Sequence, residues 1–370
     1  MTDARLLVAA LRDPATVAGL DAAGWTALIS MARAESLFGT LAHRLADRPV
    51  PERVALLLAE ARADAAQAQR HALWEAEMAR RALVPLGVAP ILLKGTAYLA
   101  AGLDAALGRS IGDLDILIPR DRLDEVERAL IAAGWEWVKE DAYDDLYYRR
   151  WMHELPPLIH RERDRMIDVH HTILPLTHRR RPDAGALVEQ SIPLPAPFGL
   201  SLSDPPRRPL ESAREEGQAI DRLRWSGAGE VLRVLAPADM VVHAAAHLIA
   251  DGDMAGGPRN LWDIDRLVRQ FVEQPTFWSD LQRRAAHHDL LDPVQCAVRL
   301  AATLYGTPTP WPARARADAP YLRRLLARDG WGRQSRPVTR LGFYARSHWL
   351  RMPPLMLARH LWTKARRPDR

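Results

Sequence analysis

Residues 92–96 read LLKGT and residues 113–118 read DLDILI, and these two stretches decide the fold of the chain. The first closes an apolar run at 91–93 that has the length of a short buried strand, and a helical pattern follows at 97–106. The second alternates polar and apolar side chains with period two, as a half-buried strand does. Together they predict a strand, a glycine turn, a helix and a second strand.

The residues that follow continue this mixture of strand and helix patterns. A helical pattern at 121–133 ends before Gly134, a residue that suits the left-handed backbone common after a helix. Further strand patterns lie at 135–138, 146–152 and 166–171. The middle of the chain is therefore predicted to be an α/β unit with a small mixed sheet, and helical patterns on both sides of it predict the α+β class.

Four regions are expected along the chain. The helical character of the first is clearest after Pro51, which opens a long amphipathic run that Pro85 and Gly87 close. The third is rich in Pro, Arg and Gly, which predicts a connector that could carry an edge strand. The regions are an N-terminal helical region at 1–85, the α/β core at 86–180, the connector at 181–230, and a C-terminal helical region with a basic tail at 231–370. Helices of the last region are predicted at 238–250, 260–272, 278–288 and 293–305.

Length and composition exclude several classes of protein. With 370 residues the chain is too long for one ordinary core, and we expect about two to three domains. A hydrophobic content of 48% and a charged content of 26% exclude a disordered or collagen-like chain. The single cysteine, Cys296, excludes an internal disulfide and a cysteine-based zinc site. Residues 1–14 lack a signal-peptide pattern, and no window has the roughly 20 apolar residues of a transmembrane segment, so we expect a cytoplasmic protein.

Charge is distributed unevenly along the chain. Residues 311–370 hold 14 Arg and one Lys against three Asp, a net charge of +12, whereas the first 310 residues have a net charge of −7. A basic tail on a mildly acidic body suggests an anionic partner at the C-terminus, such as RNA or a membrane surface, although a solvated helical face has the same composition. Because the chain has 48 Arg and only three Lys, the arginine surplus by itself is weak evidence for nucleic acid.

Asp113 and Asp115 are the first candidates for chemistry. At positions i and i+2 of a strand their side chains share one face, while Leu114 points into the core. Two carboxylates so close repel each other unless a cation lies between them, and Mg²⁺ accepts such a pair while keeping positions for water and phosphate. Asp168, in the apolar strand pattern MIDVH, is the best candidate for a third carboxylate, which would allow two metal ions about 3.5–4 Å apart.

The chain resembles the nucleotidyltransferase superfamily with the DNA polymerase β-type fold, and within it a bacterial family of largely uncharacterised nucleotidyltransferases. LLKG, an arginine, DxDxL and a later DxH carry the resemblance, over about 91–171. It places Gly95 and Thr96 at the glycine turn, Asp113 and Asp115 at the paired acids and Asp168 at the third acid. It implies a minimal nucleotidyltransferase sheet and Mg²⁺-dependent transfer of a nucleoside monophosphate from an NTP such as ATP, with release of pyrophosphate; Mn²⁺ could replace Mg²⁺.

Two features differ from the superfamily pattern. Thr96 stands where Ser or Gly is commoner, which keeps a hydroxyl but adds a β-branch near the expected phosphates. The segment from Gly95 to Asp113 is longer than in compact members, so its helix must be extended or followed by a loop.

Three more side chains are candidates near the acids. The ammonium of Lys94 could meet a phosphate, although a lysine at a strand end also extends into solvent. Arg109 precedes the acidic strand by four residues and could hold a triphosphate in a bidentate manner. His170 shares the face of Asp168 and could orient the acceptor or hydrogen-bond a carboxylate, although a packed strand histidine is equally compatible with the pattern.

Other classes of function stay open. The chain could be a nucleotide-binding accessory or scaffold protein without catalysis. It could also be an HD-type metal phosphohydrolase, which would use His243 and His247 on one helix face together with the dipeptide His288–Asp289. Asp263 and Asp265 repeat the DxD spacing, but on a helix they point about 200° apart, so we expect Asp263 to pair with Arg or His instead. The acceptor could be a small molecule, a protein or RNA.

Overall fold

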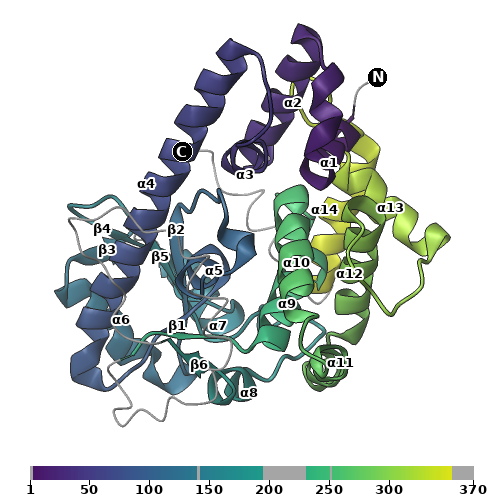
Figure 1. The fold of residues 1–370 in the computed structure, drawn as a ribbon. Helices are drawn as coiled ribbons and strands as arrows, with labels where there is room; N and C mark the ends of the chain where they lie inside the picture. Colours follow the sequence, from purple (N-terminus) through teal and green to yellow (C-terminus); the bar gives the residue numbers. More distant parts are fainter. Residues whose placement is uncertain (1–2, 140–141, 195–230, 251, 352–370) are drawn as a thin grey trace.

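The computed structural model describes residues 3–139, 142–194, 231–250 and 252–351. Within them, one seven-stranded mixed sheet lies among helices, which is the α+β class expected from the sequence. Figure 1 shows the sheet at one side of the molecule, the N-terminal helices above it and the C-terminal helices beside it. Of the predicted connector at 181–230, residues 195–230 lie outside the described residues, as does the end of the basic tail at 352–370, while the described part carries an edge strand at 192–193.

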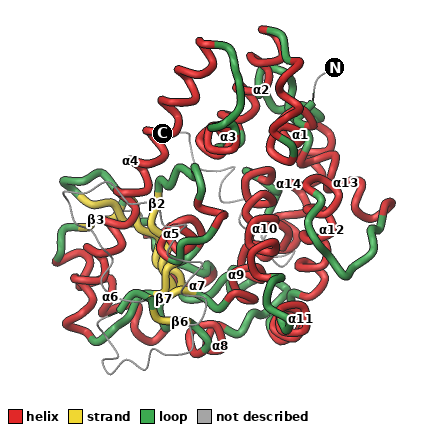
Figure 2. The backbone as a smooth tube through the Cα atoms, in the orientation of Figure 1, coloured by secondary structure: helices red, strands yellow, loops and turns green. Residues whose placement is uncertain are grey.

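The sheet has the strand order β3-β4-β5-β2-β1-β7-β6. Strand β2 is parallel to β5 and antiparallel to β1, so the acidic strand lies near the middle of the sheet. Figure 2 shows that the strands gather in one place and that helices surround them. The strands are β1 (Ile91–Leu92), β2 (Asp113–Leu117), β3 (Trp135–Trp137), β4 (Leu158–His160), β5 (Met166–His170), β6 (Ile192–Pro193) and β7 (Arg233–Val234).

Period-two alternation sets the two faces of the central strands. Leu114 and Ile116 of β2 are buried in the hydrophobic core, as are Ile167 and Val169 of β5. The aspartates between them consequently point to the opposite face. The predicted strands at 113–118 and 166–171 are confirmed to within one residue.

The helices of the N-terminal half include one very long element. As predicted, Pro51 caps the long helix and Gly87, at φ +65°, ends the short 3-10 turn after it. Figure 1 shows this helix running from the N-terminal helices down along the sheet, and it contacts β2 directly. The elements are α1 (Arg5–Arg12), η1 (Pro14–Gly19), α2 (Ala22–Ala34), α3 (Phe38–Arg44), α4 (Glu52–Leu83), η2 (Val84–Leu86), α5 (Lys94–Ala100), η3 (Asp104–Ala106), η4 (Arg120–Arg122) and α6 (Leu123–Ala132).

The C-terminal half is helical after the last strand. The four helices predicted there are confirmed, each starting one to three residues earlier than its pattern, and α9 continues into a π-helical turn. None of the helices in the described part of the chain combines the length and the apolar character needed to cross a membrane. The remaining helices are α7 (Ala142–Trp151) and α8 (Ala184–Glu189), which precede the last strand, and α9 (Pro237–Ala245), η5 (Ala246–Ala250), α10 (Gly257–Phe271), α11 (Phe277–His287), α12 (Leu291–Tyr305), α13 (Ala315–Leu325) and α14 (Pro337–Arg351), which follow it.

Two secondary-structure predictions are wrong. The pattern at 146–152 lies mostly in helix α7, where Arg149 bonds Asp145 one turn earlier and Glu127 of α6. Its aromatic residues have high strand propensity, but these ion pairs and tertiary packing favour the helix. The helix predicted at 97–106 starts at Lys94 and ends at Ala100, because Gly102 adopts φ +65° and breaks it.

A loop from 101 to 112 connects α5 to β2 and contacts the helices of both halves. Gly108 packs against Gly39 of α3 so closely that a Cβ on either glycine would lie within 2.4 Å of the other's carbonyl oxygen. The amide of Gln69 on α4 donates to the carbonyl oxygens of Ala106 and Arg109, at 2.7 and 3.1 Å. The extra length between Gly95 and Asp113 therefore forms the predicted loop, and this loop holds the α/β core against its helices.

Candidate functional site

Asp113, Asp115 and Asp168 converge on one face of the sheet. Parallel pairing of β2 with β5 puts Asp115 directly beside Asp168, and Asp113 lies two residues earlier on β2. One carboxylate oxygen from each of the three lies within 4.8 Å of the others. Asp113 is exposed, Asp168 is half-buried and Asp115 is buried, so the cluster extends from the surface into the molecule.

Two positively charged or polar partners hold Asp115. The ammonium Nζ of Lys94 lies 2.6 Å from its Oδ1, and Nε2 of His170 lies 3.0 Å from the same oxygen. Burial by itself would raise the pKa of Asp115, but Lys94 and His170 outweigh burial and bring this pKa well below its usual value. Asp115 is therefore a carboxylate at neutral pH and offers its charge to a cation.

The pKa of Asp168 is shifted in the opposite direction to that of Asp115. Burial, and then the negative charges of Asp115 and Glu154, raise the pKa of Asp168 to about 7. Burial is the larger cause of this raised pKa, and the second is the negative charge of the neighbouring carboxylates. A divalent cation would neutralise it, and a donor set made only of carboxylate oxygens is the one that Mg²⁺ and Mn²⁺ prefer. The three residues thus fit the expected metal ion.

Lys94 lies where β1 turns into α5 and has φ +47°, a backbone angle that is uncommon outside glycine. Burial lowers the pKa of Lys94, but the charge of Asp115 outweighs burial and the pKa is raised. The ammonium of Lys94 is therefore charged, and in this structure it is hydrogen-bonded to the carboxylate of Asp115. The left-handed backbone of Lys94 is strained, and strain of this kind is commonly found at functional sites; here it accompanies the contact between the ammonium and Asp115.

Arg109 is bonded to an aspartate of another element and not to any of the three in the cluster. Its guanidinium is bonded to Asp263 of α10, and Arg259 bonds the other oxygen of Asp263, at 3.1 Å from Nε. The expectation that Asp263 pairs with arginine is confirmed. The side chain of Arg109 packs directly against Gly95, and only glycine leaves room for it, since a Cβ at Gly95 would lie 2.5 Å from Nε of Arg109. Arg109 thus joins the loop to α10 through Asp263.

Thr96 is fully enclosed in the first turn of α5. Its hydroxyl oxygen is buried and has no hydrogen-bond partner among the described residues. Of the expected nucleotide-binding residues, Lys94 therefore contacts an acid of the cluster, whereas Gly95 packs against Arg109 and the side chain of Thr96 is buried.

Sequence reasoning missed Glu154, a fourth carboxylate at the site. Glu154 forms an isolated antiparallel bridge with His170, and its Oε2 lies 3.4 Å from Nδ1 of that histidine. Its charge contributes to the pKa shifts of both Lys94 and Asp168. The only sequence signal is the polar pair His153–Glu154 between an aromatic run and two prolines, which has no spacing relation to β5.

A shallow pocket adjoins the outer end of the cluster. It is lined by Asp113 itself, by Ile111 and Met166, and by the polar side chains of His71 and Arg165. Nη2 of Arg165 lies 2.6 Å from Nδ1 of His71. The exposed aspartate is therefore reachable from solvent beside a positively charged side chain.

The histidines of the HD-type interpretation are not brought together into a metal site. In the described part of the chain, neither of the two side-chain groups able to hold a metal ion includes His243, His247 or His288. His288 is buried, with Nε2 3.0 Å from Nη2 of Arg284, and Asp289 is exposed beside Arg180. Burial, and then the charge of Lys94, lower the pKa of His243 well below its usual value.

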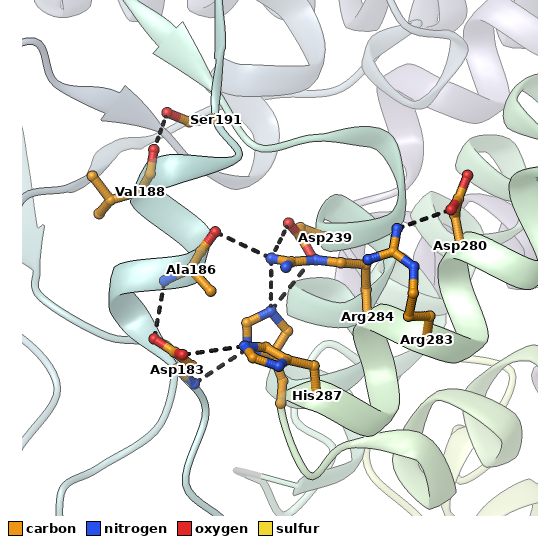
Figure 3. A network of polar contacts seen from close by, with 10 residues as sticks. Asp183, Ala186, Val188, Ser191, Asp239, Asp280, Arg283, Arg284 and His287 are labelled. Atoms are coloured by element: carbon orange, nitrogen blue, oxygen red, sulfur yellow. Dashed lines mark hydrogen bonds and ion pairs between the residues drawn. The ribbon is translucent and has the colours of Figure 1, made fainter.

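Figure 3 shows a polar network around Arg284 and His287 of α11. Arg284 forms a bidentate pair with the buried Asp239, at 2.7 Å for both oxygens, and also donates to the carbonyl oxygen of Ala186. Asp183 caps α8 by accepting from the backbone of Ala186 and lies 3.1 Å from Nε2 of His287. The network joins α8, α9 and α11.

Comparison with known proteins agrees with the geometry at the sheet. The model of a family described as uncharacterised nucleotidyltransferases matches residues 21–197 and 201–306, which include all three aspartates, Lys94 and Glu154. No curated protein matches the chain. The matched residues run from α2 to just after α12, well over half of the chain, and the chain therefore belongs to this family of uncharacterised nucleotidyltransferases.

Proposed function

We propose that the protein transfers a nucleoside monophosphate from an NTP, such as ATP, to a hydroxyl or phosphate acceptor and releases pyrophosphate. The observation that carries the proposal is the convergence of Asp113, Asp115 and Asp168, in a chain of a nucleotidyltransferase family, within 4.8 Å of one another. Three carboxylates at this separation suit divalent cations that bind phosphate oxygens.

Mg²⁺, or Mn²⁺ in its place, would be held by the three aspartates. When bound, the ion would neutralise negative charge on the phosphates and on the acceptor oxygen. Asp113 and Asp115 would hold the metal and through it the triphosphate. Asp168 would complete the set and, as the carboxylate on β5 beside Asp115, would accept the proton of the acceptor hydroxyl.

The balance of the reaction follows from these roles. The acceptor oxygen forms a bond to the α-phosphorus while the bond from that phosphorus to the bridging oxygen breaks and pyrophosphate leaves. The acceptor proton passes to Asp168. Lys94 keeps Asp115 ionised and oriented. We assign to the turn at Gly95 and Thr96, where the threonine side chain is packed inside, a contact with the phosphates through its backbone N–H groups. Arg109, bonded to Asp263, would act indirectly by positioning the loop that precedes β2.

We also propose that the basic tail, residues 311–370, binds an anionic partner. A net charge of +12 over 311–370 would attract a phosphate-bearing molecule at low ionic strength. RNA, a protein side chain and a small molecule are all compatible with an in-line transfer at the aspartates.

A screen of radiolabelled NTPs tests this function. Purified protein is incubated with each α-labelled NTP, Mg²⁺ or Mn²⁺, and cell lysate as the source of acceptor, and pyrophosphate release is measured in parallel. We expect label in one class of product and loss of transfer by at least a hundredfold in Asp113→Asn and Asp115→Asn. Asp124→Asn, which changes an exposed carboxylate on α6, is the matched control and should keep full activity. Full activity of Asp115→Asn would refute the assignment.

One observation favours a second candidate, a nucleotide-binding scaffold without catalysis. The Lys94 ammonium already neutralises Asp115 at 2.6 Å, so the buried part of the site is balanced without a metal ion. A scaffold would bind NTP but release no pyrophosphate with any acceptor, whereas the transferase would do both.

A further inference from the structure

We propose that His153, Glu154 and His170 form a second cation site, distinct from the aspartates, that takes a transition-metal ion of the Zn²⁺ type. The three side chains offer two imidazole nitrogens and one carboxylate oxygen, all within 4.8 Å of one another. This inference concerns metal binding by the chain and does not depend on the proposed transfer reaction.

The spacing of the donor atoms matches a small ion. Oε2 of Glu154 lies 3.6 Å from Nε2 of His153 and 3.4 Å from Nδ1 of His170, so the carboxylate oxygen lies between the two rings. Ligands about 2.1 Å from a tetrahedral ion are roughly 3.4 Å from each other. The two separations that involve Glu154 are therefore already close to those of a coordinated ion.

One nitrogen of each ring, Nδ1, is buried without a hydrogen-bond partner among the described residues. Nδ1 of His170, the atom that faces Glu154, is buried and has no hydrogen-bond partner in the part of the chain that the structure describes. The same holds for Nδ1 of His153, and the side chain of His170 is only 3% exposed. Buried polar atoms without partners are costly, and a metal ion bound at Nδ1 of His170 would remove that cost.

Backbone pairing fixes two of the three ligands. Glu154 lies directly opposite His170 in an antiparallel bridge, and the backbone N–H of His171 donates to the carbonyl oxygen of His153 at 2.8 Å. The segment that carries His153 and Glu154 is thus attached to the end of β5, and a ligand set on paired backbone is preorganised for an ion.

The donor types separate this site from the aspartate site. Imidazole nitrogen favours Zn²⁺, Co²⁺ and Ni²⁺, whereas sites of carboxylate oxygen alone suit Mg²⁺ and Mn²⁺. The two sites meet at His170, because its other ring nitrogen, Nε2, lies 3.0 Å from Oδ1 of Asp115. A metal-bound histidine commonly donates its second N–H to a carboxylate, which fixes the ring orientation. His170 would therefore couple the second ion to the position of Asp115.

Cobalt titration of the metal-free full-length protein tests the site. Co²⁺ reports its coordination by visible absorption, and Zn²⁺ should displace it while excess Mg²⁺ should not. We expect one Co²⁺ per chain at this site, with affinity at least tenfold weaker in His153→Ala and in Glu154→Gln. Asp113→Asn and Asp168→Asn should keep the spectrum, as should His287→Ala, an exposed histidine on α11 that serves as the matched control.

In Asp115→Asn we expect weaker Co²⁺ binding with the coordination retained. The substitution leaves all three ligands in place but changes the carboxylate behind His170, so we expect Co²⁺ affinity to fall about 10–100-fold without loss of the spectrum. If His153→Ala does not fold, Glu154→Gln, which conserves volume, decides the question alone. An unchanged Co²⁺ spectrum in Glu154→Gln, or a spectrum lost in Asp113→Asn and Asp168→Asn instead, would overturn the proposal.

Discussion

At the scale of single residues, the backbone of Lys94 gives a test that separates conformation from charge. A side chain at φ +47° is strained, and glycine relieves this strain whereas alanine does not. Both Lys94→Gly and Lys94→Ala remove the ammonium from Asp115 and should abolish transfer. We expect the glycine variant to be more stable than the alanine variant by about 1 kcal/mol, measured by urea unfolding. Equal stability would show that the angle is not strained.

Gly95 makes a prediction about packing. A methyl group there would lie 2.5 Å from Nε of Arg109, a group fixed by Asp263, so Gly95→Ala must displace the guanidinium. We expect a loss of about 1–3 kcal/mol in the free energy of unfolding, measured by urea unfolding.

Gly112→Ala is the matched control for Gly95→Ala, because a Cβ at Gly112 meets nothing within 4 Å. Its stability should change by less than about 0.5 kcal/mol. If Gly95→Ala left the free energy of unfolding unchanged, the guanidinium of Arg109 would have space to shift, and the predicted clash would be wrong.

The candidate site could be predicted from sequence only where one strand carries the pattern. The DxD spacing predicts that Asp113 and Asp115 share a face, and the resemblance pointed to Asp168, which the structure places beside Asp115. Glu154 could not be found in this way, since its position depends on an irregular segment that pairs with the end of β5. The direction of Arg109 was also out of reach, because its partner Asp263 lies 154 residues away.

At the scale of elements, the polar network of Figure 3 carries a pH prediction. Burial would raise the pKa of Asp239, but hydrogen bonds from His288 and Arg284 outweigh it, and the pKa is lowered. A lowered folded-state pKa means that the stabilisation is complete above the unfolded value of about 3.9 and is lost as pH falls below it.

Asp239→Asn should therefore be much less stable than the native chain at pH 7, by about 3 kcal/mol, since it leaves Arg284 buried without its carboxylate. Thermal unfolding at a series of pH values should show this difference narrowing below about pH 4. Asp280→Asn removes an exposed ion pair with Arg283 in the same region and should cost less than about 1 kcal/mol. A gap that stays constant down to pH 3 would contradict the assignment.

Element types could be predicted where periodicity was strong and failed where it was weak. The four C-terminal helices follow clear 3.6-residue patterns, and α4 is marked by Pro51 and Gly87. The aromatic residues of α7 predict a strand by propensity, whereas in the structure the ion pairs of Arg149 with its two carboxylate partners accompany a helix. Strand β4 was missed because it has three residues and follows two prolines.

At the scale of the whole molecule, one hydrophobic cluster extends from Ala4 to Phe343 and includes residues of the sheet and of both helical regions. The length of the chain predicts about two to three domains, yet this shared core joins the described residues. We therefore expect one cooperative transition in calorimetry, with equal calorimetric and van't Hoff enthalpies. A fragment of residues 86–180 should remain unfolded by circular dichroism. Two separate transitions, or a folded fragment, would show that the regions are independent.

The contact of Gly39 with Gly108 limits how this protein can be recombined with its relatives. The two backbones touch where no side chain fits, so a donor sequence with any larger residue at one position would push the other away. A chimaera that imports a foreign N-terminal segment must consequently import the matching loop before β2 as well. A crossover between residues 39 and 108 would take the two contacting glycines from different parents, whereas a crossover before residue 39 or after residue 108 would keep both from one parent.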